Sequence, residues 1–170
     1  ITVRHYRVDL ELHLDPPVLH GSAAITVRAL RDTSRLSLDA TRLKIARVTA
    51  DGANLRFTVA KDRLCVELPA ALRAGEERVV DVVYEASTDG RSPVFAGRVA
   101  WAGYQTSAWT PTLQDPAERA TLELLVTTRA GLRVVGSGAP QGTTAAEGDR
   151  VTHAFRLETP SPPFLFAFAA

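Results

Sequence analysis

The side chains of this sequence best suited to bind a metal or to transfer protons are four histidines and one cysteine. His5 and His13 fall with Glu11 on the polar side of an alternating segment, and neighbours on one face of an extended strand lie about 6.6 Å apart. Glu11 and His13 could therefore share an ion. A zinc site, however, takes three or four ligands from converging elements. We interpret these residues as part of a solvated face.

The other candidates favour structural roles. His153 shares the phase of apolar residues, so we expect a core histidine that hydrogen-bonds a neighbour. His20 precedes Gly21 in an expected turn, and Cys65 lies in a strand-like run that favours a packed or half-exposed thiol. The sequence contains no H-E-x-x-H, C-x-x-C or G-x-S-x-G, and no pair of carboxylates stands in an apolar setting. We therefore expect no complete catalytic site and no metal site within this chain.

The segment 101–116 is the least ordinary part of the sequence. It holds both tryptophans, a tyrosine, two glutamines and two prolines without a repeating pattern. Large aromatic side chains in loops are enriched at interfaces. The segment could line a binding surface, or it could cover one end of the fold.

Short strands must position these residues. Residues 5–14 alternate apolar and polar side chains, with Tyr6, Val8, Leu10, Leu12 and Leu14 in one phase, which predicts a half-buried strand. Pro16 and Pro17 end it, and a second strand follows at 23–29. Further strands are expected at 36–38, 43–49, 55–59, 64–68, 79–84, 121–128, 132–135, 151–157 and 164–168.

No segment keeps a helical period over ten residues. The tract 136–148, rich in Gly, Ala and Thr, is interpreted as a long mobile hairpin loop. About a dozen short, mostly antiparallel strands predict an all-β protein, folded as a β-sandwich that forms a single domain over residues 1–170.

Composition excludes several function classes. The formal net charge is +1, and acidic residues separate the 18 arginines and two lysines, so we expect no nucleic acid and no membrane as partner. No apolar run reaches the length of a membrane span. One cysteine allows no intrachain disulfide, which favours a cytoplasmic location. The first residue is Ile rather than Met, which suggests a segment of a longer protein.

Five passages stand in the order found in a known family: residues 5–12, 38–45, 72–84, 109–123 and 163–170. The fourth passage includes W-T-P, D-P and R-A-T-L-E. Together they resemble the N-terminal domain of the zinc aminopeptidases, the gluzincin family that includes alanyl aminopeptidases and leukotriene hydrolases. The resemblance covers nearly the whole chain.

This resemblance implies a saddle-like β-sandwich followed by a thermolysin-like catalytic domain, which carries the zinc on H-E-x-x-H. No cofactor is implied for this chain itself. In the family, a zinc-bound water attacks the first peptide bond, and the N-terminal domain forms one wall of the cleft. The implied partners are the catalytic domain of the same polypeptide and a peptide substrate.

The resemblance also implies one substrate-binding residue, Gln105, which would hold the free amino terminus of the peptide. The sequence departs from the family pattern nearby. Ser107 stands where an acidic residue is expected, Gln114 stands where the family often has Asp, and Asp115 is shifted by one position.

We therefore expect a non-catalytic N-terminal domain of a zinc-dependent aminopeptidase. One alternative is an interaction scaffold from a catalytically dead family member. Another is an unrelated carbohydrate- or protein-binding β-sandwich module, suggested by Trp101, Tyr104 and Trp109. In the isolated chain the surface meant for the catalytic domain would be exposed, so we expect apolar groups near 101–116 and 164–170 to mediate weak self-association.

Overall fold

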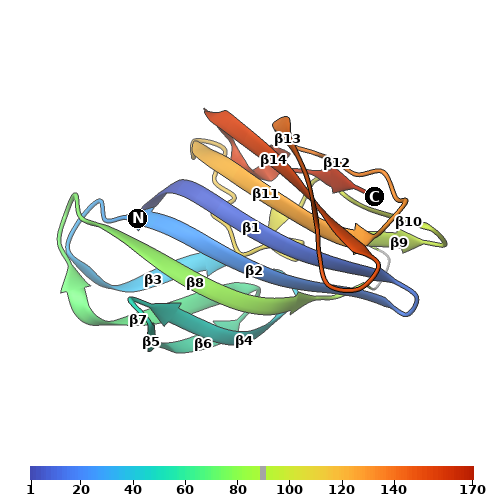
Figure 1. Ribbon diagram of the computed structural model, residues 1–170. Coiled ribbons are helices and arrows are strands. Elements are labelled where there is room, and N and C mark those ends of the chain that lie inside the picture. Colours follow the sequence, from blue (N-terminus) through green and yellow to red (C-terminus); the bar gives the residue numbers. More distant parts are fainter. Residues whose placement is uncertain (89–90) are drawn as a thin grey trace.

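The computed structural model describes residues 1–88 and 91–170, in which fifteen strands form three sheets (Figure 1). The large sheet has eight strands in the order β13-β14-β11-β1-β2-β8-β4-β5. Their bounds are β1 Thr2–Leu14, β2 Pro17–Arg28, β4 Leu43–Ala50, β5 Ala53–Asn54, β8 Glu77–Ala86, β11 Ala120–Arg129, β13 Ala139–Ala145 and β14 Arg150–Ser161. Among the described strands, every pairing is antiparallel except that of β1 with β11.

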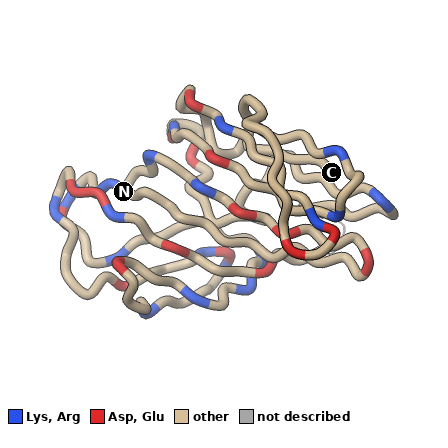
Figure 2. Tube along the Cα trace, in the orientation of Figure 1, with Lys and Arg blue, Asp and Glu red and all other residues tan. Residues whose placement is uncertain are grey.

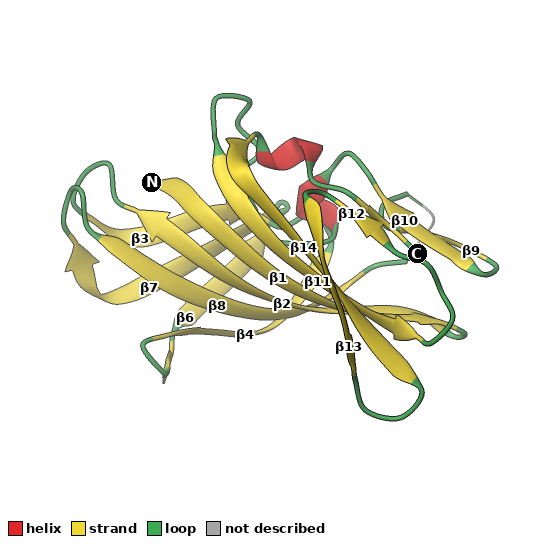
Figure 3. Cartoon of the chain, turned by 45° about the horizontal axis from the view of Figure 1, so that its top comes forward, coloured by secondary structure: helices red, strands yellow, loops and turns green. Residues whose placement is uncertain are grey.

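Two smaller sheets complete the fold. The three-stranded sheet has the order β3-β7-β6, and the four-stranded sheet has the order β12-β15-β10-β9. Their bounds are β3 Thr33–Asp39, β6 Arg56–Ala60, β7 Arg63–Leu72, β9 Val94–Ala96, β10 Val99–Ala102, β12 Val135–Gly136 and β15 Phe168–Ala169. Two short 3₁₀ helices, η1 Thr106–Ala108 and η2 Pro163–Leu165, lie side by side (Figure 3). The expected all-β class and mostly antiparallel pairing are confirmed.

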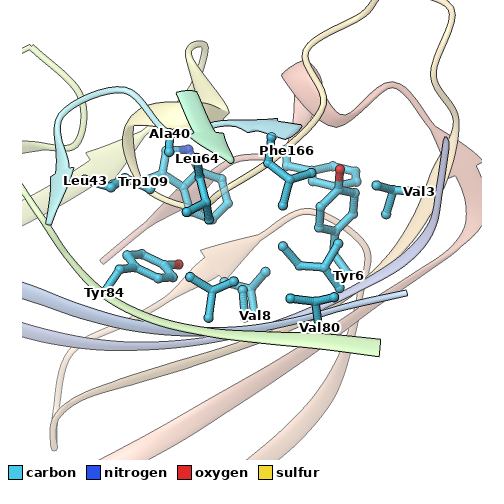
Figure 4. Packing of buried hydrophobic residues seen from close by; sticks show 14 of the residues in the cluster. Val3, Tyr6, Val8, Ala40, Leu43, Leu64, Val80, Tyr84, Trp109 and Phe166 are labelled. Carbon is cyan, nitrogen blue, oxygen red and sulfur yellow. The ribbon is translucent and has the colours of Figure 1, made fainter. Parts of the chain in front are cut away.

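One hydrophobic core joins the three sheets. Alternation in β1 works as expected, with Tyr6, Val8, Leu10 and Leu12 buried, while Leu14 is only half-buried. Leu64 comes from the three-stranded sheet and Phe168 from the four-stranded sheet. Figure 4 shows Tyr6, Tyr84, Trp109 and Phe166 converging on this interior. Because both small sheets bury a face against the large one, the fold is a sandwich.

The tract 136–148 is not the expected loop. Its middle forms β13, which pairs antiparallel with β14 and makes the edge of the large sheet. All seven residues of β13 are exposed, so no alternation of apolar and polar side chains marks it. Backbone hydrogen bonding, which the side-chain pattern does not encode, makes this strand.

Two further expected strands were wrong, and two strands were missed. The segment 164–168 begins as the helix η2, because Pro162 and Pro163 lack the N–H groups that a strand ladder needs. Only its last residue joins β15. Of the strand expected at 132–135, only Val135 is paired, in β12. Strands β9 and β10 were not expected at all.

Gly21 and His20 lie inside β2 rather than in a turn. Gly21 is opposite Tyr84 in the pairing of β2 with β8. A Cβ at Gly21 would overlap the Tyr84 ring, so the ring lies across the glycine. The glycine serves close packing between strands, not chain reversal.

The surface carries mixed charge. Figure 2 shows Lys and Arg interspersed with Asp and Glu over the visible strands. Many of these are paired across strands, such as Arg7 with Glu123 at 3.1 Å and Lys44 with Glu85 at 2.7 Å. Within residues 1–88 and 91–170, no helix is long and apolar enough to cross a membrane.

Candidate functional site

The segment 101–116 divides into an exposed half and a buried half. Trp109 is fully buried, and its ring meets Phe168 edge-on at a centroid distance of 5.3 Å. Trp101 and Tyr104 are 42% and 80% exposed. The second half of the segment covers the core, as one interpretation expected. In the first half Trp101 and Tyr104 face outward, and a binding surface there stays a prediction.

Gln105 lies at the turn between β10 and η1, with its side chain exposed. Its φ of 39° and ψ of 52° are left-handed, and the preceding Tyr104 is left-handed as well, with a φ of 57°. The carbonyl of Gln105 accepts a hydrogen bond from the amide of Ala108 at 2.7 Å. Two consecutive non-glycine residues in this region each cost about 1 kcal/mol or more. We call the two residues Tyr104 and Gln105 the tip.

Hydrogen bonds to η1 brace the tip from three directions. The side-chain amide of Gln114 is assigned the orientation that satisfies its neighbours, in which Oε1 accepts from the backbone amides of Thr106 at 2.8 Å and Ser107 at 3.0 Å. The buried hydroxyl of Thr106 donates to the carbonyl of Pro163 at 2.8 Å. Thr41 donates its amide to the carbonyl of Ser107 at 2.8 Å, and the two hydroxyls lie 2.9 Å apart. The left-handed tip therefore adjoins a helix, η1, that these hydrogen bonds hold in place.

A second layer of contacts fixes Gln114 itself. The backbone N–H of Gln114 donates to Oδ2 of Asp39 at 3.0 Å. Asp39 and Thr112 also exchange two backbone hydrogen bonds, at 2.7 and 2.9 Å. The buried hydroxyl oxygen of Tyr6 accepts from the hydroxyl of Thr112 and from the amide of Leu113, both at 3.1 Å. Burial raises the pKa of Tyr6 to about 12. The tip is therefore connected to the centre of β1.

These supporting residues were not identified from the sequence. Only Tyr6 carried a signal, because a hydroxyl in the apolar phase of a strand needs a buried partner. Gln114 was noted as a departure from the family pattern. Its structural role depends on the position of η1, which no local pattern reveals.

His5 and His13 lie on the polar side of β1, where the alternation placed them. The Nε2 atom of His13 is 3.0 Å from Oε1 of Glu11, and Arg150 adds an ion pair to that carboxylate at 3.5 Å. His20, in β2, meets the His13 ring edge-on at 6.2 Å. His5 places Nδ1 2.7 Å from the hydroxyl of Thr121, and burial lowers its pKa. The Glu11 carboxylate is thus engaged by His13 and Arg150.

The remaining candidates are surface or near-surface groups. His153 is half-buried rather than in the core, because its strand β14 lies next to the edge of the large sheet. Phe155, which lies on the same side of β14, is buried. Cys65 is exposed, with its Sγ 3.8 Å from the hydroxyl of Ser37. Across the part of the chain that the structure describes, no group of three or more His, Cys, Asp or Glu could hold a metal ion. These residues do not fit a zinc centre.

Known structures match this fold closely, although no protein-family model matches the sequence. The M1 zinc metallopeptidase from Deinococcus radiodurans is 25% identical, with a TM-score of 0.86. A mutant of the enzyme from the same organism, bound to a Tyr-Ser-Ala substrate, is 23% identical with a TM-score of 0.88. A mutant of a two-domain M1 zinc metallopeptidase, bound to L-tryptophan, is 24% identical with a TM-score of 0.87.

In each case the match covers 99% of this chain but only 42% of the matched chain. The chain thus spans less than half the length of these peptidases. It has the fold of the N-terminal domain of the M1 zinc metallopeptidases.

Proposed function

We propose that residues 1–170 form a single β-sandwich domain, the non-catalytic N-terminal domain of a zinc-dependent aminopeptidase. The observation that carries this proposal is the match over 99% of the chain to two-domain zinc metallopeptidases of more than twice its length. The described residues do not fit a zinc site. Zinc, which activates water and polarises a carbonyl in such enzymes, is therefore assigned to a catalytic domain elsewhere in the polypeptide.

In this proposal the tip faces the substrate cleft. The Gln105 side chain is exposed, and its amide oxygen can accept a hydrogen bond from the α-ammonium group of a peptide. The solved neighbour with a Tyr-Ser-Ala substrate supports a peptide as the ligand. The braces at Thr41, Gln114 and Pro163 support the same role, because a binding group held in place loses less entropy when the ligand binds.

The catalytic domain would dock on the outer face of the four-stranded sheet. Val135, Ala169, Trp101 and Val94 are opposite one another across its four strands. Val135 is 63% and Trp101 42% exposed, while the neighbours Ala100 and Ala102 are buried. An apolar row across an outer sheet face favours a protein partner. We call this row the apolar face.

The test uses the natural protein that contains this chain. We expect about one zinc ion per polypeptide by elemental analysis, and release of the N-terminal residue from unblocked peptides. Chelation should abolish the activity, and an acetylated peptide should resist cleavage. A protein with neither zinc nor activity would contradict the proposal and would support the interaction scaffold, whose motivation is the altered sequence around Ser107 and Gln114.

The carbohydrate-binding alternative loses its main support. It required an aromatic platform of Trp101, Tyr104 and Trp109, but Trp109 is fully buried. The cytoplasmic location expected from the single cysteine stays a prediction, which fractionation of cells producing the natural protein would test.

A further inference from the structure

Tyr104 combines high exposure with an unfavourable backbone conformation. At 80% exposed it is the most exposed of the large hydrophobic side chains in the described ranges. Its φ of 57° places a bulky aromatic residue where glycine would be less strained. The Tyr104 side chain makes no hydrogen bond or ring contact among the described residues that would offset this cost within the domain.

The strain persists because the surrounding residues determine the conformation. Tyr104 precedes Gln105, whose carbonyl starts η1, and η1 is held by Gln114 and by the buried bond from Thr106 to Pro163. Strained, exposed side chains on a fixed base are a feature of ligand-contacting sites. The contact that favours a tyrosine at this position is therefore expected outside the domain.

We propose that Tyr104 contacts the side chain of the first residue of the peptide substrate and favours large apolar residues there. This inference rests on the proposed aminopeptidase function. If the Gln105 amide holds the α-ammonium group, the substrate's first side chain lies within a few ångströms of the tip. The face of the tyrosine ring offers apolar contact area with little loss of conformational freedom.

The experiment measures kcat/KM of the complete natural protein on aminoacyl 4-nitroanilides of Phe, Leu and Ala. Tyr104→Ala should lower kcat/KM for Phe and Leu about tenfold, and for Ala less than about twofold. Tyr104→Phe should keep the wild-type ratios, because the ring face remains. Val59→Ala, at a 44% exposed site on β6, should change nothing.

Equal losses on all three substrates would overturn the inference, since a structural defect at the tip would not discriminate between side chains. No loss on any of them would overturn it as well. Tyr104→Gly relieves the strain and removes the ring, so it should keep or raise the melting temperature while losing the same selectivity. A wild-type protein without zinc or activity would instead overturn the proposed function, which separates the two failures.

Discussion

At the residue scale, the packing of Tyr84 over Gly21 makes the clearest prediction. A Cβ at position 21 would overlap the fully enclosed Tyr84 ring, and β2 cannot move because β1 and β8 flank it. Gly21→Ala should therefore lower the free energy of unfolding by about 2–3 kcal/mol. Chemical denaturation of the chain measures this change.

Gly103→Ala is the matched control. A Cβ there meets no atom within 4 Å, and its φ is not in the left-handed region. This variant should change stability by less than about 0.5 kcal/mol. Equal stability of the two variants would contradict the close packing at Gly21.

Tyr6 predicts how stability depends on alkaline pH. Burial raises its folded pKa to about 12, above the ordinary value of 10.0. The neutral phenol therefore stabilises the fold fully below pH 10, and this contribution is lost as the pH rises through 12. Between pH 9 and 12, the free energy of unfolding should therefore fall by up to about 2–3 kcal/mol less in Tyr6→Phe than in the wild-type protein. Urea titrations at several pH values measure it, and identical pH profiles for both proteins would contradict it.

At the element scale, Gln114 is expected to control the rigidity of the tip. Gln114→Ala leaves the amides of Thr106 and Ser107 without their acceptor and should cost about 1–2 kcal/mol. Hydrogen exchange of these two amides should become faster. Gln114→Glu should keep both bonds, because a carboxylate is also an acceptor.

Gln141→Ala provides the control for this element, because Gln141 lies on exposed β13 and its side chain donates to the nearby carbonyl of Ala139. Hydrogen exchange of the η1 amides in Gln141→Ala should match that of the wild-type protein. Unchanged exchange in Gln114→Ala would show that the tip is held by other contacts.

Elements with one buried face were predictable from the sequence, and elements without one were not. Strand β1 carries five alternating apolar residues, and its burial follows them closely. Strand β13 has no buried side chain and is defined by backbone pairing alone. The segment at Pro163 looked like a strand because of its three phenylalanines, but its conformation follows from the prolines.

Within the candidate site, the sequence singled out Gln105 for substrate binding through the family resemblance alone, and this role stays a prediction. The left-handed backbone at Tyr104 and Gln105 has no signal in residue type, because neither is a glycine or an asparagine. The braces from Thr41, Gln114 and Pro163 join segments that are far apart in the sequence. Such contacts depend on the tertiary fold and are absent from local patterns.

At the scale of the whole molecule, the apolar face predicts how the isolated chain behaves. Without a partner, Trp101 and Val135 remain 42% and 63% exposed, so the chain should self-associate weakly at high concentration. Trp101→Glu with Val135→Lys should make it monomeric. Val59→Lys, a change at a similarly exposed valine, should leave self-association intact. Sedimentation velocity measures all three, and a strictly monomeric wild-type chain would contradict the prediction.

We propose that this domain supplies a wall of an aminopeptidase cleft through its tip. A crystal structure of the complete natural protein with a bound tripeptide would show where the tip lies. We expect the side-chain oxygen of Gln105 about 3 Å from the peptide's α-amino nitrogen, with Tyr104 against the first side chain. A tripeptide bound at the zinc while the tip faces solvent and touches no part of the peptide would disprove this role.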